Sequence, residues 1–593
     1  MCRANRDKII NIKEARILKQ IVKYVMMHFK TLMIGTIALI MVIAFDLFNP
    51  WLQQQFIDKG IIGGEVSVIP AILGGILGVC FVKVVFGYIK EYTYDRFSTK
   101  VQKDLRMDMF RHIQSLEFKY FDGMNTGELM SRIGEDVYAI WDAIGFWFRF
   151  FAENAVYIIT STIILFFYSW KLTLICLALV IPVAVMAIFL EKKSAKFYSE
   201  ISDKTADINV TAQEDIAGVR LVKAFAREDY EVKKFMKLNK DYYNLNVGLS
   251  NVNGKYYSGI DFFVALVQVA LIVIGGIFVI KGELTIGALV AFNGYLSNLI
   301  WPIKNVGQMV TLMAQTIESM KKVGNILDRP SEVVSKDNAV APKQIQGGIE
   351  FNNVSFGYND EEVLHDINLN IPAGSTVAIM GTTGSGKSTL LNLIGRYYET
   401  DKGTIKVDGV DVKDYELGAL RSRMAIVPQD NFLFSDSVKN NITFSNTDAS
   451  KEEIETVCEI SCTNEFVHDL PDDIDTEVGE RGIGLSGGQK QRISIARALA
   501  RKSSILILDD STSALDMETE HELLKNLNNK SKDATTFIVA HRISAVKNAD
   551  MILYLEDGRI VEQGNHQELL AKKGKYYEIY REQFKDFDKT EVV

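Results

Sequence analysis

The sequence predicts an all-α membrane domain of six transmembrane helices followed by an α/β domain. Six long apolar stretches precede residue 328, and short β-branched runs separated by turns and helices begin at Ile349. The chain has 593 residues, too many for one hydrophobic core. With 48% hydrophobic and 24% charged residues, it is too apolar for an ordinary soluble enzyme and too charged to lie wholly in lipid. Its net charge of -8 argues against a nucleic-acid-binding protein.

The segment before the first apolar stretch mixes basic with apolar residues. Its basic residues are Lys8, Lys13, Arg16, Lys19, Lys23 and Lys30. This pattern is typical of an amphipathic elbow helix that lies on the inner membrane surface. No small-residue cleavage site follows the first apolar run, so we expect no cleavable signal peptide.

The six apolar stretches are each long enough, or nearly so, to cross about 30 Å of hydrocarbon. They lie at Leu32–Trp51, Val68–Tyr88, Phe146–Trp170, Leu172–Leu190, Ile260–Ile280 and Ala288–Met313. The connections after the second and fourth stretches are long and polar, and their heptad-like apolar spacing predicts helices that continue beyond the membrane. Lysine and arginine concentrate in these two connections, which predicts that they, the N-terminus and the C-terminal half are cytoplasmic. We therefore expect a multi-pass protein of the cytoplasmic (inner or plasma) membrane.

These patterns give the expected domain bounds. We expect a transmembrane domain over residues 1–328, with the elbow helix and long cytoplasmic helical extensions. A looser stretch over residues 329–348 is the expected linker, and residues 349–593 form the expected α/β domain.

A phosphate-binding loop follows an early strand of the α/β half. The apolar run Val377–Met380 predicts the strand, and Leu390–Ile394 predicts the helix after the loop. The loop residues are Gly381, Thr382, Thr383, Gly384, Ser385, Gly386, Lys387, Ser388 and Thr389. Glycines let backbone N–H groups surround phosphates, while Lys387 is expected to reach the β and γ oxygens and Ser388 to bind Mg²⁺. The sequence therefore predicts a P-loop nucleotide-binding domain that takes ATP and Mg²⁺.

Two further segments point to the same ligand. The strand Ile505–Leu508 ends in Asp509, a carboxylate placed to hold Mg²⁺. Leu485 precedes Ser486, Gly487, Gly488 and Gln489, ahead of a helix expected to start near Gln491. These residues offer a second set of N–H donors for phosphate. One domain cannot easily grip one ATP with two such loops, so we expect the second loop to serve the nucleotide of a facing domain.

The phosphate loop, Leu485–Gln489 and Asp509, in this order, resemble the ATP-binding cassette (ABC) family. The resemblance implies that Tyr358 stacks on adenine, that Gln429 senses Mg²⁺ and the membrane half, and that His541 acts at the γ-phosphate. Taken alone, His541 would more often be a core histidine; the surrounding motifs reverse that expectation.

The membrane half resembles the exporters of the same family, of the multidrug-exporter type. The matching pieces are Asn49-Pro50 with Ile57-Asp58, Phe121-Asp122 with Thr126–Leu129, Trp170–Leu174, Val222–Phe225 and Gly282–Gly287. In the cassette, Thr476–Gly482 is similar to the exporter loop that contacts the coupling helices, and Ser513–Asp516 to the loop that crosses the dimer interface. The resemblance implies coupling through helices near Tyr120–Leu129 and Asp207–Ile216. One membrane half and one cassette make half of a transporter, which implies a dimer.

The chain departs from the family pattern at Asp510. The family usually has a Glu there, after the strand-end Asp509, to polarise the attacking water. Aspartate is one methylene shorter, so its carboxylate lies about 1.5 Å further from the water, and an error of about 1 Å can cost roughly 10²-fold in rate. This favours a weak site, as in the degenerate-site subunit of a bacterial heterodimeric exporter whose partner supplies the Glu. A homodimer in which Asp510 is a slower, working base stays an alternative.

The substrate leaves few marks in the sequence. Asp46, Glu153 and Asp261 lie near or within the spans, where charges are expensive and often functional. The acids hint at cationic amphiphiles, and the aromatic-rich segment Phe146–Phe151 suits apolar cargo, so we expect amphiphilic small molecules, drug-like compounds or lipids. The alternative is that these acids face water, pair with Lys83 or Lys304, or lie at an interface. An ATP-gated channel or membrane sensor is the other function class that this sequence fits. Cys458 and Cys462 are one helical turn apart, and we expect buried structural thiols rather than a zinc site.

Overall fold

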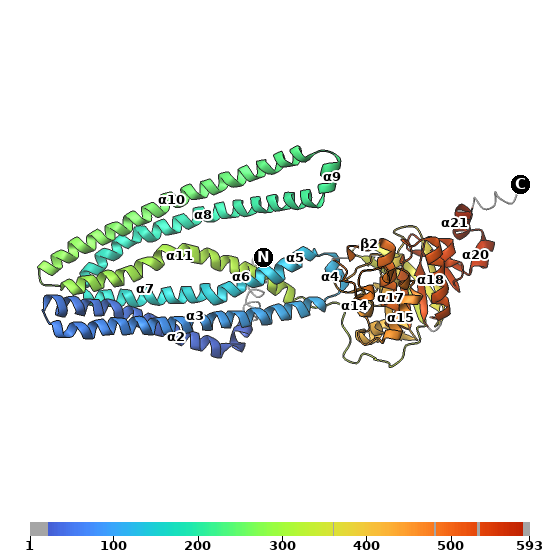
Figure 1. The fold of residues 1–593 in the computed structure, drawn as a ribbon, viewed down its shortest axis with the longest axis horizontal. Helices are drawn as coiled ribbons and strands as arrows, with labels where there is room; N and C mark the ends of the chain where they lie inside the picture. The colour runs from blue at the N-terminus through green and yellow to red at the C-terminus, as the bar shows by residue number, and fades with distance from the viewer. Residues whose placement is uncertain (1–21, 360, 480–481, 531–533, 585–593) are drawn as a thin grey trace, which may run out of the picture. The chain divides into compact units, whose positions relative to one another are not determined.

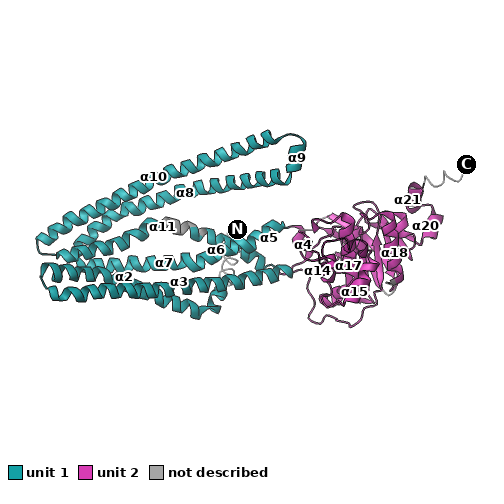
Figure 2. Ribbon diagram, in the orientation of Figure 1, with its two compact units in different colours: residues 1–115, 124–329 teal, residues 116–123, 330–593 magenta. Residues whose placement is uncertain are grey.

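The computed structural model describes residues 22–359, 361–479, 482–530 and 534–584, without the side chains of residues 306–311, 314 and 530. The chain forms two compact units. Unit 1 comprises residues 1–115 and 124–329, and unit 2 comprises residues 116–123 and 330–593 (Figure 2). Most of the predicted elbow helix lies outside the described residues; residues 22–27 are helical.

Unit 1 is a bundle of long helices (Figure 1). The expectation of six spans is confirmed: within the described residues, six helical segments are long and apolar enough to cross a membrane. The bundle contains α2 Phe29–Gln55, α3 Ile69–Gln114, α5 Thr126–Ser131, α6 Val137–Asp142, α7 Phe148–Tyr168, α8 Trp170–Ala217, α9 Val219–Ala224, α10 Glu228–Ile280 and α11 Ile286–Leu327. Three π-helical turns, η1 Phe56–Ile62, η3 Arg132–Asp136 and η4 Ala143–Trp147, extend or join these helices, and the 3₁₀ turn η2 Val66–Val68 precedes α3.

Three helices of the bundle are much longer than a membrane crossing requires, and whether they extend into the cytoplasm as expected stays a prediction. Helix α3 has 46 residues, α8 has 48 and α10 has 53. At about 1.5 Å per residue each is about 70 Å or longer, more than twice the hydrocarbon thickness. The break between the third and fourth spans falls at Ser169, so Trp170, expected in the third span, begins α8 instead. Ser169 caps that helix by accepting a hydrogen bond from Leu172.

Two of the sequence motifs meet at one end of the bundle. The Asp58 carboxylate accepts hydrogen bonds from the Thr285 hydroxyl at 2.6 Å and from the Gly287 N–H at 2.9 Å. A Cβ atom on Gly287 would lie 2.7 Å from the Asp58 carboxylate and 2.6 Å from the Gln54 carbonyl oxygen. Glycine is therefore required for α2 and the start of α11 to approach this closely.

Unit 2 confirms the predicted α/β fold. One sheet has the order β2-β1-β4-β5 and the other β10-β9-β3-β8-β7-β6. In the second, β9, β3, β8, β7 and β6 are parallel and β10 is antiparallel to β9. The strands are β1 Ile349–Tyr358, β2 Glu361–Ile371, β3 Thr376–Gly381, β4 Lys402–Val407, β5 Val410–Asp411, β6 Met424–Val427, β7 Ile505–Asp509, β8 Thr535–Val539, β9 Met551–Glu556 and β10 Arg559–Gly564.

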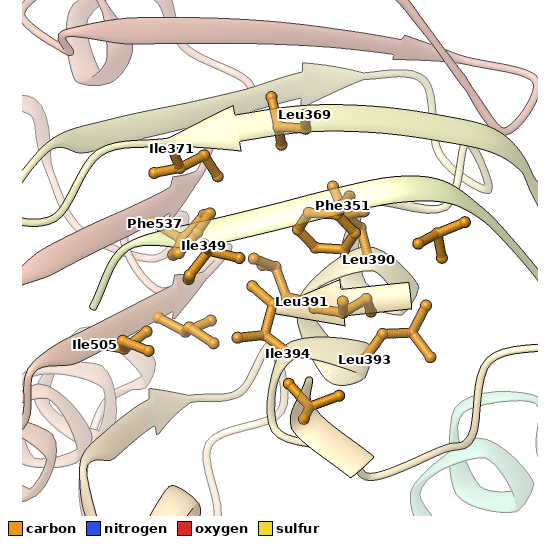
Figure 3. Packing of buried hydrophobic residues seen from close by; sticks show 14 of the residues in the cluster. Ile349, Phe351, Leu369, Ile371, Leu390, Leu391, Leu393, Ile394, Ile505 and Phe537 are labelled. Carbon is orange, nitrogen blue, oxygen red and sulfur yellow. The ribbon is translucent and has the colours of Figure 1, made fainter. Parts of the chain in front are cut away.

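Helices cover the parallel sheet, whose strands read as continuous apolar runs because both faces are buried. The helices of unit 2 are α4 Phe118–Asp122, α12 Lys387–Ile394, α13 Leu417–Ser422, α14 Val438–Thr443, α15 Lys451–Ile460, α16 Asn464–Val467, α17 Gly487–Leu499, α18 Met517–Lys530, α19 Ile543–Val546, α20 His566–Lys572 and α21 Lys575–Phe584, with 3₁₀ turns η5 Val412–Asp414 and η6 Asp473–Asp475. In the main core cluster, Leu390 and Ile394 of α12 pack against Phe351 of β1 and Phe537 of β8 (Figure 3). This core fixes the helix that follows the phosphate loop.

The expected linker has no helix or strand of its own, and its residues from Pro330 onward belong to unit 2. Val340 forms an isolated β-bridge with Tyr415, and Lys336 pairs with Asp414 at 2.5 Å. The segment is thus tied to the cassette surface. The domain bounds at residues 1–328, 329–348 and 349–593 stay a proposal.

Candidate functional site

Four neighbouring parallel strands bring the predicted cassette residues to one edge of the sheet. The order β3-β8-β7-β6 places the phosphate loop after β3, His541 after β8, Asp509 at the end of β7 and Gln429 after β6. Carboxyl ends of parallel strands meet at the same edge, where ligands bind in such folds. These side chains line one cavity of about 300 Å³. Its lining residues are Tyr358, Val363, Thr383, Gly384, Gly386, Lys387, Ser388, Thr389, Gln429, Asp509, Asp510, Val539 and His541.

The loop itself has the geometry of an anion cradle. Gly384 and Gly386 have φ of +83° and +97°, values that other residues adopt only with strain. Lys387 is 8% exposed, and its ammonium donates hydrogen bonds to the carbonyl oxygens of Gly381 and Thr382, at 3.0 and 2.8 Å. Burial lowers the pKa of Lys387, while the carboxylates of Asp509 and Asp510 oppose this effect.

The buried hydroxyl of Ser385 indicates that the loop can hold a phosphate. Ser385 is 2% exposed, and its Oγ has no hydrogen-bond partner among the described residues. A buried donor without a partner costs about 1–3 kcal/mol. A phosphate oxygen held in the loop would accept its proton, so the cradle fits a nucleotide phosphate.

Ser388 and Asp509 form the part of the cavity suited to Mg²⁺. Asp509 is 9% exposed and accepts a hydrogen bond from Ser388. Burial raises the pKa of the Asp509 carboxyl; the bond from Ser388 lowers it, Asp510 raises it and Lys387 lowers it. Paired oxygen ligands of this kind suit Mg²⁺, which needs one or two protein oxygens besides phosphate and water. Gln429 is exposed at the same cavity.

Asp510, the departure from the family pattern, follows β7 with a left-handed backbone at φ +48°. Its N–H donates to the Val539 carbonyl oxygen at 3.2 Å, and its own carbonyl oxygen accepts from Ser513 Oγ at 2.9 Å. These two hydrogen bonds fix the Asp510 backbone. The backbone therefore cannot shift to make up for the shorter reach of the aspartate side chain.

Tyr358, the predicted adenine-stacking residue, is connected to an aromatic group that sequence reasoning missed. Its hydroxyl lies 3.3 Å from Thr389 Oγ1, and its ring contacts the Tyr398 ring edge-on at a centroid distance of 5.2 Å. Tyr398 donates a hydrogen bond to Asp122 of α4 at 2.7 Å. The Phe118 ring of α4 stacks on Tyr397 at 4.6 Å. Helix α4 lies between segments of unit 1 in the sequence, yet it contacts Tyr397 and Tyr398, next to Tyr358.

Residues 486–489 do not line this cavity. Ser486 and Gln489 form a reciprocal cap: the Ser486 N–H donates to Gln489 Oε1 at 2.8 Å, and the Gln489 N–H donates to Ser486 Oγ at 3.3 Å. Helix α17 begins at Gly487 rather than near Gln491, because this cap starts it earlier than expected. A Cβ atom on Gly488 would lie 3.1 Å from the Ala514 carbonyl oxygen, so the loop packs against Ser513–Asp516.

The exporter loop is described only in part. Its segment Thr476–Gly479 is tied to residues 436–438: the Val438 N–H donates to the Thr476 carbonyl oxygen at 3.0 Å, and the Val478 N–H donates to the Asp436 carbonyl oxygen at 3.0 Å. Residues 480 and 481, also part of this motif, lie outside the described residues.

The acidic residues of the spans are paired, as the alternative interpretation expected. Lys83 donates to Asp46, and Lys304 lies 2.7 Å from Asp261. Glu153 lies 3.3 Å from Lys90, a partner that the sequence did not single out. Each of these three acids therefore has a basic partner in this structure.

Aromatic side chains near the start of α7 form a separate cluster. Phe146 contacts Trp147 and Phe150 at centroid distances of 4.9 and 5.5 Å, and Phe150 contacts Trp301 of α11 at 5.5 Å. Phe146 is 41% exposed and Trp301 is 53% exposed within this chain.

The two cysteines that lie one helical turn apart belong to hydrophobic core clusters of unit 2. Cys458 and Cys462 are buried, and burial raises the pKa of each to about 11. At neutral pH both thiols are therefore protonated.

Comparisons with known proteins cover both halves. Residues 32–303 match the family model described as the ABC transporter transmembrane region, and residues 364–513 match the one described as ABC transporter. The chain is 34% identical over 564 residues to YgaD of Bacillus subtilis, named as a proposed multidrug export ATP-binding/permease protein, covering 93% of this chain and 96% of that protein. It is 35% identical over 573 residues to the ATP-dependent lipid A-core flippase of Desulfotalea psychrophila, covering 96% and 99%. A bacterial Atm1-family ABC exporter solved with ATP bound has a TM-score of 0.80 at 28% identity, over 94% of this chain and 98% of that chain.

Proposed function

This chain belongs to the ABC transporter family, and we propose that it exports amphiphilic small molecules, drug-like compounds or lipids, as one subunit of a dimeric exporter. As a member of the family it is an ATPase coupled to transport. One observation supports the proposal most: Tyr358, Lys387, Asp509 and His541 line a single cavity, in a chain with six candidate spans among its described residues. We place the cassette and both termini on the cytoplasmic side.

ATP and Mg²⁺ are the proposed cofactors. The loop of residues 381–389 would hold the phosphates, and Tyr358 would stack on adenine. Ser388, Gln429 and Asp509 would hold Mg²⁺, which neutralises the charge that develops on the transferred phosphoryl group. His541 would orient the γ-phosphate, and Asp510 would polarise the attacking water.

The dimer is proposed to be a heterodimer. The capped residues 486–489 are intact as a phosphate-binding loop, with the Gly487 and Gly488 N–H groups in the first turn of α17. They lie outside this chain's own cavity, so they would serve the nucleotide of the facing cassette. Asp510 makes this chain's own site the weaker one, and the partner would supply a glutamate at that position. A homodimer with Asp510 as working base is the alternative.

The tip of the α8–α10 hairpin supports the need for a partner. A short helix, α9, lies there at Val219–Ala224, just beyond the range expected for the second coupling helix. Within this chain, Leu221 is 64% exposed and Phe225 is 70% exposed. Apolar side chains on a polar extension stabilise the protein only if they are covered. We propose that α9 contacts the partner's cassette.

The cargo is proposed to be an amphiphile whose apolar part contacts the aromatic cluster of Phe146, Trp147, Phe150 and Trp301. Aromatic rings bind apolar groups of varied shape and also attract cations through their faces. Because the acids of the spans are paired, the cluster, rather than a free carboxylate, supports this proposal.

Transport in inverted membrane vesicles tests the function. We expect ATP-dependent accumulation of a fluorescent amphiphile, which Ser486→Arg, in the loop proposed to serve the partner's nucleotide, strongly reduces. Lys572→Ala is the control and should transport like the wild type, because Lys572 lies on α20, outside both the cavity and residues 486–489. An ATP-gated channel would dissipate a gradient and never build one, so dissipation without accumulation would overturn export in favour of the channel.

A further inference from the structure

The segment that carries His541 is hydrogen-bonded to α21, the C-terminal helix of the cassette. Gln583 of α21 donates from Nε2 to the His541 carbonyl oxygen at 2.8 Å and accepts at Oε1 from the Ile543 N–H at 2.8 Å. One side-chain amide thus forms hydrogen bonds to the main chain on both sides of residue 542, and we call this pair of bonds the Gln583 clamp. Two such bonds at ideal length fix both the position and the orientation of this short segment.

The start of α19 has no cap of its own to replace this clamp. Arg542 occupies the N-cap position, and its side chain makes no capping hydrogen bond. It reaches the other way instead, to the Glu520 carboxylate at 3.1 Å and the Leu515 carbonyl oxygen at 3.4 Å. The Ile543 N–H is one of the first-turn donors that need an outside acceptor, and Gln583 supplies it.

Helix α21 is itself firmly seated. Tyr576 of this helix is fully buried, and Ile579 and Tyr580 pack against the core cluster that contains Ile543 and Val546. Gln583, by contrast, is exposed. Its substitution therefore leaves the core intact and removes only the two hydrogen bonds to the His541 segment.

We propose that Gln583 is a positioning residue for His541, which makes the C-terminal helix part of the machinery that distinguishes ATP from ADP. The inference rests on the proposed role of His541 at the γ-phosphate. Between them, Gln583 on one side and Arg542 with Glu520 on the other hold residues 541–543 at the cavity edge. Loss of the clamp lets the His541 side chain leave the γ-phosphate, while the loop that binds the α- and β-phosphates is unchanged.

Equilibrium binding of radiolabelled ATP and ADP, each with Mg²⁺, to the full-length chain in lipid nanodiscs tests this proposal without requiring turnover. Gln583→Met keeps the approximate side-chain length but neither hydrogen bond. We expect it to raise the Kd for ATP by about tenfold, as when the one hydrogen bond from His541 to the γ-phosphate is lost, and to leave the Kd for ADP unchanged. Gln583→Glu, which can still accept from Ile543, should lose less. Glu582→Ala on the same exposed helix end is the matched control and should bind both nucleotides like the wild type.

A double variant separates positioning from general stability. If Gln583 acts through His541, then Gln583→Met added to His541→Ala should weaken ATP binding no further than His541→Ala alone. Amide exchange at Ile543 should also speed up in Gln583→Met. Equal losses for ATP and ADP, or additive effects in the double variant, would overturn the proposal. Failure of the wild type and Glu582→Ala to bind ATP would instead refute the nucleotide role of the cavity.

Discussion

Replacing Asp510 by glutamate should raise ATP turnover at this chain's own site. The Asp510 backbone is held by the Val539 carbonyl oxygen and the Ser513 hydroxyl, so it cannot move forward to make up for a short side chain. One added methylene advances the carboxylate by about 1.5 Å, and an error of about 1 Å costs roughly 10²-fold. We expect Asp510→Glu to accelerate hydrolysis by about 10²-fold, or about 2.7 kcal/mol of transition-state stabilisation.

The same substitution should cost a little stability. Asp510 has φ of +48°, a left-handed conformation that aspartate tolerates better than glutamate because its short side chain bonds locally. We expect Asp510→Glu to lower the free energy of unfolding by about 1 kcal/mol. A faster enzyme that is slightly less stable is the signature of a gain in positioning rather than in folding.

Phosphate release by the full-length chain in nanodiscs, at saturating Mg-ATP, is the measurement. Asp510→Asn, which keeps the shape without a base, and Lys387→Ala set the baseline. The reasoning is wrong if the wild type turns over briskly with vanadate sensitivity, Asp510→Asn abolishes turnover and Asp510→Glu gives no gain. Asp510 would then be a working base, and the homodimer would become the better proposal.

Three other changes have defined outcomes. Tyr398→Phe removes the hydrogen bond to Asp122, so we expect unchanged ATP affinity but several-fold weaker stimulation of turnover by transport substrates; equal stimulation would show that the bond does not couple. Asp46→Asn leaves Lys83 without its carboxylate in the span and should destabilise the membrane half by about 2–3 kcal/mol in denaturation assays, whereas an unchanged midpoint would mean that the pair is solvated. Burial lowers the pKa of His566 in the folded chain. The unfolded chain therefore binds a proton at His566 more tightly, and the free energy of unfolding decreases as the pH falls below about 6.5, the pKa of histidine in the unfolded chain. The melting temperature should fall between about pH 7.5 and 5.5, and less steeply in His566→Gln, by thermal denaturation at each pH.

The sequence predicts the cassette well because its motifs are local and ordered. The phosphate loop lies between a strand and a helix, and strand order then determines what meets it. Asp509 ends one parallel strand of the sheet, and Gln429 and His541 follow two others, so all three reach one cavity without any need for specific long-range contacts. The six spans are equally local, since length and apolarity identify each one.

Apart from the pairing of span acids with Lys83 and Lys304, side-chain partners across long stretches of chain were not predicted. The sequence marks Asp58 and Gly287 as motif residues but does not say that one caps the other's helix. Tyr398 and Gln583 belong to no motif, yet they connect the cavity to α4 and α21. Such pairs depend on rotamers and on the packing of whole elements, which residue patterns do not encode.

The two phosphate-binding loops of this chain are proposed to act on different nucleotides. Variants in the two loops should therefore have equal effects in a homodimer and unequal effects in a heterodimer. Lys387 would act on the chain's own nucleotide, whereas Ser486, which lies outside that cavity, would act on the partner's. In a homodimer, each site uses one Lys387 and one Ser486, so disabling either residue must abolish turnover alike. In the proposed heterodimer, most turnover occurs at the partner's site, which needs this chain's Ser486 but not its Lys387. Ser486→Arg should therefore reduce hydrolysis by the assembled transporter far more than Lys387→Ala, and equal losses would contradict the heterodimer even if Asp510→Glu gains activity.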